Sequence, residues 1–237
     1  MTASGAHSET ASQCPAALSV CVFDLDHTLV DSPLDLRTVG REMEAFARDR
    51  GVVLPVRELR WSGAEILAVV RREAAHLEAE LIAIPVAHER RAMAHATLVP
   101  FAREALAAMK ELGHATAVWT NNDRVVADFV LARFDLLPYL DLVVTRDDVL
   151  QLKPDPDGLR VVRRRWPGAE RIVVVGDSWV DGAAAHAGGA PFIAYRGDPE
   201  ELSRRGVMPA AHISSLLDLP AALAERRSAP RVCGTGS

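Results

Sequence analysis

The sequence predicts an α/β fold, in which a doubly wound parallel sheet carries a small helical insert. Short apolar segments rich in β-branched residues recur along the 237 residues, and most are separated by stretches of helical periodicity, which is the pattern of a parallel sheet. The segments are continuous rather than alternating, as in strands buried on both faces. The interval 33–99 has only helical patterns and breaks this alternation.

Strands and helices are expected to follow one another through the rest of the chain. Five segments have the composition of buried strands, and they lie at 17–23, 115–119, 140–145, 171–175 and 191–195. The helical pattern over 101–112 ends at Gly113, a residue that favours helix C-termini. The next pattern, over 124–134, can be capped by Asn122 or Asp123.

The insert has amphipathic helical patterns at 36–51 and 64–84, bounded by Pro55 and Pro85. The alternative is that these helices simply pack on a face of the sheet. Both ends of the chain are rich in small and polar residues, which is typical of segments without fixed structure. The sequence therefore predicts a disordered tail over 1–16, an α/β core formed by 17–32 together with 100–226, a helical insert over 33–99 and a second disordered tail over 227–237.

Composition excludes several classes of protein. The net charge of -5 gives no basic surface for nucleic acid. The three cysteines form no CxxC pair, so neither a zinc site nor a disulfide framework is indicated. No secretory signal and no apolar run of about 18 residues is present, so we expect a cytoplasmic protein that does not bind a membrane; the oligomeric state stays open.

Carboxylates follow two of the expected strands. Asp24 and Asp26 end the first strand, whereas Asp177 and, one turn later, Asp181 follow the strand at 171–175. Because the carboxyl ends of parallel strands meet at one edge of a sheet, these four side chains are expected in one crevice. Their mutual repulsion calls for a cation. With oxygen ligands only, the expected ion is Mg²⁺.

Groups that bind a phosphoryl group are expected at the same edge. Thr120 and Asn121 end the strand at 115–119 and precede a helix N-terminus, where anions bind well. Lys153 lies in a proline-bounded loop, and Lys110 is the only other lysine in a chain whose 27 basic residues are otherwise arginines. A compact ammonium group at Lys153 is therefore expected to fit between phosphoryl oxygens and Asp181 better than a guanidinium group.

These motifs, in this order and over about 19–219, resemble the haloacid dehalogenase superfamily, in particular its phosphoglycolate-phosphatase-like branch. The matching residues are Asp24, Asp26 and Thr28, then Thr120, then Lys153, then Gly176, Asp177 and Asp181. The resemblance implies that the insert is a mobile helical cap. One residue departs from the family pattern: His27 stands where glycine is commonest, and it is expected to narrow the mouth of the site.

The resemblance also implies a role for each residue. Asp24 is the expected nucleophile, which forms an aspartyl-phosphate, and Asp26 is the expected general acid and base. Mg²⁺ would be held by the Asp24 carboxylate, the Asp26 backbone carbonyl and Asp177. The phosphoryl oxygens would be bound by Thr120, the Asn121 backbone and Lys153, with Asp181 orienting Lys153 or a metal-bound water. These roles describe a phosphatase acting on a small phosphorylated metabolite.

Other interpretations stay open or are less favoured. A phosphomutase would carry the same motifs, and a regulatory module could keep the fold without turnover. The "GDSW" segment resembles a serine-hydrolase signature around Ser178, but no later Asp-x-x-His follows. Neither "HERRAMAH" nor the pair of Asp155 and Asp157 has metal-ligand spacing. Candidate substrate contacts in the insert are Arg37, Arg41, Arg60 and Trp61.

Overall fold

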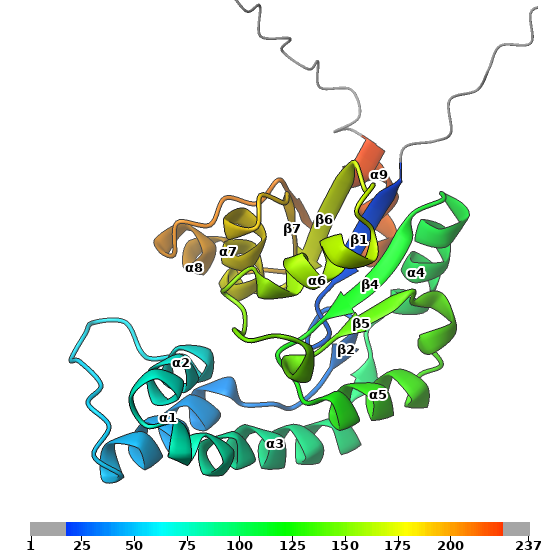
Figure 1. Ribbon diagram of the computed structural model, residues 1–237. Coiled ribbons are helices and arrows are strands. Elements are labelled where there is room, and N and C mark those ends of the chain that lie inside the picture. Colours follow the sequence, from blue (N-terminus) through cyan, green and yellow to red (C-terminus); the bar gives the residue numbers. More distant parts are fainter. Residues whose placement is uncertain (1–17, 225–237) are drawn as a thin grey trace, which may run out of the picture.

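A computed structural model describes residues 18–224 of the chain. The tails predicted to be disordered, 1–16 and 227–237, lie outside this range. Six parallel strands form the central sheet in the order β5-β4-β1-β6-β7-β8 (Figure 1). Their bounds are β1 Ser19–Phe23, β4 Ala115–Trp119, β5 Leu142–Val144, β6 Arg171–Gly176, β7 Phe192–Tyr195 and β8 Ala211–Ile213. The predicted doubly wound parallel sheet is confirmed. β8 is an edge strand that the sequence did not reveal, because His212 interrupts its short apolar segment.

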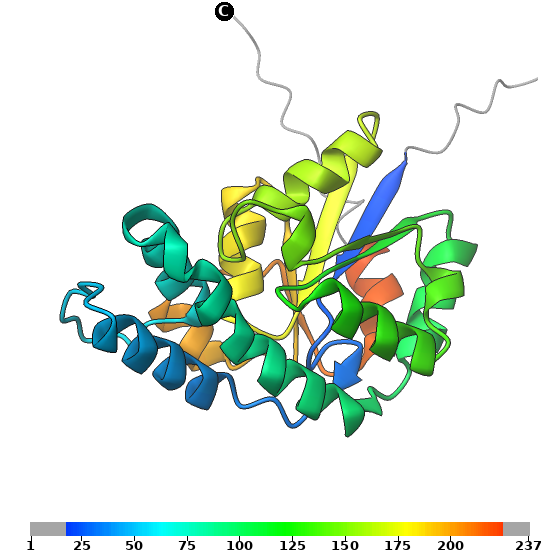
Figure 2. The ribbon, with the colours of Figure 1, turned by 60° about the horizontal axis from the view of Figure 1, so that its bottom comes forward.

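Helices cover both faces of the sheet (Figure 2). Alternate residues of β1 point to opposite faces: Cys21 and Phe23 pack with α4, α5 and α9, whereas Val20 and Val22 pack with α6, α7 and α8. These helices are α4 Ala102–Glu111, α5 Arg124–Arg133, α6 Asp157–Arg165, α7 Trp179–Ala187, α8 Pro199–Arg204 and α9 Leu219–Ala224. The alternation explains the continuous apolar runs, because every residue of β1 is buried.

Between β1 and β4, three helices form a separate layer beside the carboxyl edge of the sheet (Figure 1). They are α1 Leu36–Asp49, α2 Gly63–Glu73 and α3 Glu78–Ala94, with a short 3₁₀ turn, η1 Ala75–Leu77, before α3. Asp35 caps α1, and Ser62 forms a capping box with Glu65 at the start of α2. The helices share an apolar cluster of their own, which includes Met43, Leu67 and Leu81.

Two details of this layer differ from the sequence prediction. The boundary at Pro85 is wrong, because α3 runs through Pro85 to Ala94. Pro85 removes one backbone hydrogen bond, but Leu81, Pro85 and Glu89 are buried at successive i, i+4 positions of one face, so packing maintains the helix. The second detail is β3 Thr97–Leu98, which pairs antiparallel with β2 Val30–Asp31. Two residues per strand are too few to give a recognisable sequence pattern.

Candidate active site

The ammonium group of Lys153 lies at the centre of the carboxyl edge. Its Nζ donates hydrogen bonds to Asp24 Oδ1 at 2.5 Å, to Asp181 Oδ1 at 2.5 Å and to the carbonyl oxygen of Trp119 at 2.9 Å. Burial alone would lower the pKa of Lys153, but the carboxylates of Asp181 and Asp24 outweigh burial and raise the pKa. Lys153 is therefore a fixed positive charge whose three donors are all in use.

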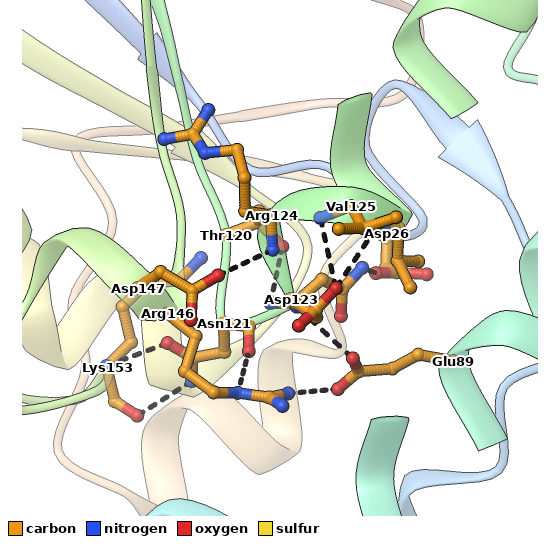
Figure 3. Close-up of polar contacts among 12 residues, drawn as sticks. Asp26, Glu89, Thr120, Asn121, Asp123, Arg124, Val125, Arg146, Asp147 and Lys153 are labelled. Carbon is orange, nitrogen blue, oxygen red and sulfur yellow. Dashed lines mark hydrogen bonds and ion pairs between the residues drawn. The ribbon is translucent and has the colours of Figure 1, made fainter. Parts of the chain in front are cut away.

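Asn121 ties the loop of Lys153 to the end of β4. The backbone N–H of Lys153 donates to Asn121 Oδ1 at 3.0 Å, and Asn121 Nδ2 donates to the Lys153 carbonyl oxygen at 3.0 Å. Thr120 is buried beside it, and its Oγ1 accepts a hydrogen bond from the backbone N–H of Asn122 at 3.1 Å. Asp123 then caps α5, so this helix begins at the site (Figure 3).

Asp24, Asp177 and Asp181 form a compact acidic group, in which one carboxylate oxygen of each lies within 4.8 Å of the others. Gly176 permits this approach, since a Cβ there would lie 2.7 Å from the Asp181 side chain. Burial raises the pKa of Asp177 to about 9, with Asp181 and Asp24 adding to the effect. Burial raises the pKa of Asp24 to about 7, although Lys153 opposes it. Crowded carboxylates with raised pKa values and oxygen donors alone fit a hard divalent cation.

The carboxylate of Asp26 is held by two hydrogen bonds and is not part of that acidic group. Asp26 Oδ1 accepts from Ser32 Oγ at 2.6 Å, and Asp26 Oδ2 accepts from Asn122 Nδ2 at 2.6 Å. Burial raises the pKa of Asp26, and these two hydrogen bonds only partly offset it. The site thus separates two carboxylates that lie two residues apart, because Asp24 contacts Lys153 and Asp26 contacts Ser32 and Asn122.

His27 occupies a backbone position that favours glycine. Its φ is 56°, in the left-handed region, where a side chain costs about 1 to 2 kcal/mol. The turn is held by the His27 N–H, which donates to the Val30 carbonyl oxygen at 2.6 Å. His27 lines the cavity in front of the acidic group, and its Nδ1 lies 3.5 Å from Asp31 Oδ1.

A buried ion pair next to the site was missed by the sequence analysis. Glu89 of α3 and Arg146, which follows β5, are 4% and 6% exposed and form an ion pair through Glu89 Oε1 and Arg146 Nη2. Arg146 Nε donates to the Asn121 carbonyl oxygen at 3.0 Å, and Glu89 Oε2 accepts from the Asp123 N–H at 3.2 Å (Figure 3). The pair joins the helical layer to the core. The sequence signal was slight, because Glu89 lies in the "HERRAMAH" segment, which was set aside as lacking metal-ligand spacing.

A cavity of about 270 Å³ lies between the acidic edge and the helical layer, and both contribute to its walls. All seven expected site residues line it; they are Asp24, Asp26, Thr120, Asn121, Lys153, Asp177 and Asp181. None of the four candidate contacts in the insert does. Arg37, Arg41 and Arg60 are exposed, and Trp61 Nε1 donates to the Pro55 carbonyl oxygen at 3.2 Å instead.

The motifs that the sequence analysis set aside have structural partners. Ser178 Oγ donates to Asp181 Oδ2 at 2.6 Å at the start of α7. His88 Nε2 lies 2.8 Å from Glu42 Oε2. Asp157 Oδ2 accepts hydrogen bonds from the backbone N–H groups of Leu150 and Gln151. Each of the three motifs therefore has a hydrogen-bonding role within the fold.

Six parallel strands that bring a buried lysine and an acidic group to one edge define a Rossmann-like α/β protein with its site at the carboxyl ends of the strands. Within that class, the chain belongs to the haloacid dehalogenase-like hydrolase family, whose family model matches residues 18–189. This result confirms the family expected from the motifs.

Comparisons with known proteins agree on the family and the fold. The chain is 34% identical over 234 residues to the plasmid phosphoglycolate phosphatase of Cupriavidus necator, a match that covers 92% of this chain and 96% of that protein. It is 33% identical over 213 residues to a phosphoglycolate phosphatase of Cereibacter sphaeroides, covering 84% and 95%. A hydrolase from Pseudomonas syringae has the same fold at 24% identity and a TM-score of 0.64, covering 87% and 98%.

A second solved structure, a haloacid dehalogenase-like hydrolase from Bacteroides fragilis, shares the fold at 22% identity and a TM-score of 0.63, covering 85% of this chain and 99% of that chain. Within residues 18–224, no helix has the length and apolar character needed to cross a membrane.

Proposed function

We propose that this protein is a Mg²⁺-dependent phosphatase that hydrolyses a small-molecule phosphate monoester through an aspartyl-phosphate on Asp24. The observation that carries the proposal is the contact of a fully engaged Lys153 with Asp24 beside an acidic group suited to a cation. Relatives that share 33% to 34% of their residues with this chain are named phosphoglycolate phosphatases, which supports the same type of reaction.

Each covalent step has a group on this chain to perform it. An Asp24 carboxylate oxygen attacks phosphorus as the ester P–O bond breaks, and Asp26 gives its proton to the leaving oxygen. The raised pKa of Asp26 suits this role, since burial favours the protonated carboxyl group that donates the proton. Asp26 then removes a proton from water, which attacks phosphorus, releases phosphate and restores the Asp24 carboxylate.

Other groups hold the phosphoryl group while these bonds change. Lys153, through its positive charge, and the hydroxyl of Thr120 are proposed to bind its oxygens, together with the backbone N–H of Asn121 at the start of the turn before α5. Mg²⁺, bound by Asp24, Asp177 and the backbone carbonyl of Asp26, would supply positive charge that offsets the phosphoryl charge. Asp181 positions Lys153 through their 2.5 Å contact.

We also propose that α1, α2 and α3 act as a cap over the site. They contribute a wall of the cavity and have their own apolar cluster, and their connections to the core pass through β2 and β3. A closed cap would exclude water from the aspartyl-phosphate until the leaving group has departed.

The direct test is release of inorganic phosphate from an aryl phosphate, measured with Mg²⁺ and with EDTA. Phosphate release that depends on Mg²⁺ supports the proposal. Absence of release under both conditions would favour a module without turnover, and conversion of a sugar phosphate to its isomer without phosphate release would identify a phosphomutase.

Lys153→Arg should lower kcat/KM by about 10²-fold or more, because a guanidinium group cannot occupy the space in which Nζ contacts Asp24, Asp181 and Trp119. Lys110→Arg is the matched control, since Lys110 forms a surface ion pair with Asp141. Steady-state kinetics on the aryl phosphate measure both. Equal activity of the two variants would mean that Lys153 acts only through its charge.

The effect of Mg²⁺ on stability should grow with pH. On folding, the pKa of Asp24 rises from 3.8 to about 7 and that of Asp177 rises from 3.8 to about 9. Without the metal, the protonated carboxyl groups therefore contribute their full stability below the unfolded-state pKa of 3.8. This contribution is lost as the pH rises through the folded-state pKa values. Mg²⁺ displaces these protons. The rise in Tm caused by Mg²⁺ should therefore be larger at about pH 9 than at about pH 6.

Thermal unfolding with Mg²⁺ and with EDTA at both pH values measures this effect. Asp177→Asn is the control variant, because it removes the carboxylate with the higher of the two pKa values. A rise in Tm that is independent of pH would contradict binding at this acidic group.

A further inference from the structure

The wall that the helical layer contributes to the cavity is almost entirely apolar. Apart from Gly63, Ser62 and Glu89, the cavity residues from this layer and the loop before it have apolar side chains, among them Leu34, Val39, Met43, Leu67, Ile82 and Pro85. The hydroxyl of Ser62 is already bonded to Glu65 in the capping box of α2. A leaving group directed toward this wall would therefore find apolar side chains and no free hydrogen-bonding partner.

Neither of the two strongly basic side chains in the cavity walls is available for a second anion. Lys153 uses its three ammonium donors on Asp24, Asp181 and Trp119. Arg146 is paired with Glu89 and also donates to the Asn121 carbonyl oxygen.

The remaining Nη1 of Arg146 is buried and has no hydrogen-bond partner among the described residues.

Carboxylates, in contrast, are abundant in the same walls; they are Asp24, Asp26, Glu89, Asp177 and Asp181. The positive charges of one divalent cation and of Lys153 would be offset by the transferring phosphoryl group. An anionic leaving group would lose its hydration against an apolar wall and would find no free cationic side chain there.

We infer that the preferred substrate is a monoester whose leaving group is small, apolar and uncharged, and that a second anionic group, as in phosphoglycolate, is disfavoured. The inference rests on the proposed function and narrows it. The volume of about 270 Å³ leaves room for a leaving group of about the size of an aromatic ring beside the phosphoryl group. Ile82 is the cavity residue best placed for a test, because it is partly exposed and should tolerate a charge.

The experiment compares phosphoglycolate with isobutyl phosphate, in which two methyl groups replace the two carboxylate oxygens. With Mg²⁺ present, kcat/KM should be higher for isobutyl phosphate by about tenfold or more. Ile82→Arg places a cation in the apolar wall and should reduce this ratio by roughly the same factor. Ala83→Arg is the matched control, because Ala83 is the next residue of α3, is exposed and does not line the cavity.

The possible failures are distinct. The inference about the leaving group is wrong if phosphoglycolate is the better substrate of the unaltered protein. It is also wrong if Ile82→Arg and Ala83→Arg have the same ratio of kcat/KM for isobutyl phosphate to kcat/KM for phosphoglycolate. In both cases the proposed phosphatase stands. If no ester is hydrolysed, including the aryl phosphate, the proposed function itself is wrong. Circular dichroism of both arginine variants checks that α3 is intact.

Discussion

Asp24→Asn should reduce phosphate release by on the order of 10⁴-fold or more, since an amide oxygen is a poor nucleophile and the variant also removes a carboxylate from the acidic group. Within residues 18–224, the carboxylates of Asp24 and Asp181 are the two that contact Lys153 directly, and Asp181 also accepts two hydrogen bonds from Ser178. Asp24 is therefore the carboxylate freer to attack. Single-turnover kinetics with acid quench measure the loss and the covalent adduct together.

Asp31→Asn is the control for this experiment, because Asp31 lies seven residues further along the chain and does not line the cavity. It should keep near-normal turnover. Peptide mapping of the quenched protein should locate phosphate on Asp24. Phosphate found on Ser178 would contradict the assigned nucleophile. An Asp24→Asn variant that loses no more than about tenfold of its activity would contradict it as well.

The acidic edge could be predicted from the sequence because strand ends are local features. The apolar runs before Asp24, Thr120 and Asp177 mark three adjacent parallel strands, and adjacent parallel strands end at the same edge. Lys153 was identified by its contrast with an arginine-rich composition. In each case the informative residues were close in sequence to the element that places them.

Features that depend on tertiary packing could not be predicted in this way. The helical pattern was expected to end at Pro85, but burial of one face of α3 maintains it as far as Ala94. The separation of Asp26 from Asp24 depends on Asn122, which lies 96 residues further along the chain than Asp26. An ion pair between residues 57 positions apart, Glu89 and Arg146, is similarly invisible to periodicity.

The ion pair of Glu89 and Arg146 is also the feature of the site whose disruption should destabilise the protein most. Its two side chains are 5% and 6% exposed, so each charge has been removed from water and depends on the other. Burial raises the pKa of Glu89, and Arg146 opposes this effect. If Arg146 is removed, Glu89 retains the burial but loses its cation, so protonation of Glu89 becomes the remaining way to neutralise the site.

Arg146→Met should therefore destabilise the protein by about 3 to 5 kcal/mol near neutral pH, since it leaves a buried carboxylate without a partner. The loss should shrink as the pH falls and Glu89 takes up a proton, because a raised folded pKa makes stability greater on the acidic side.

The double variant Glu89→Gln with Arg146→Met should recover part of the stability, since glutamine carries no charge and still accepts from the Asp123 N–H. Urea unfolding at two pH values measures all three effects. Arg160→Met removes the two ion pairs that the exposed Arg160 side chain forms with Asp155 and Asp157, and it should cost less than about 1 kcal/mol. Equal losses in Arg146→Met and Arg160→Met would show that burial of the pair of Glu89 and Arg146 has no energetic consequence.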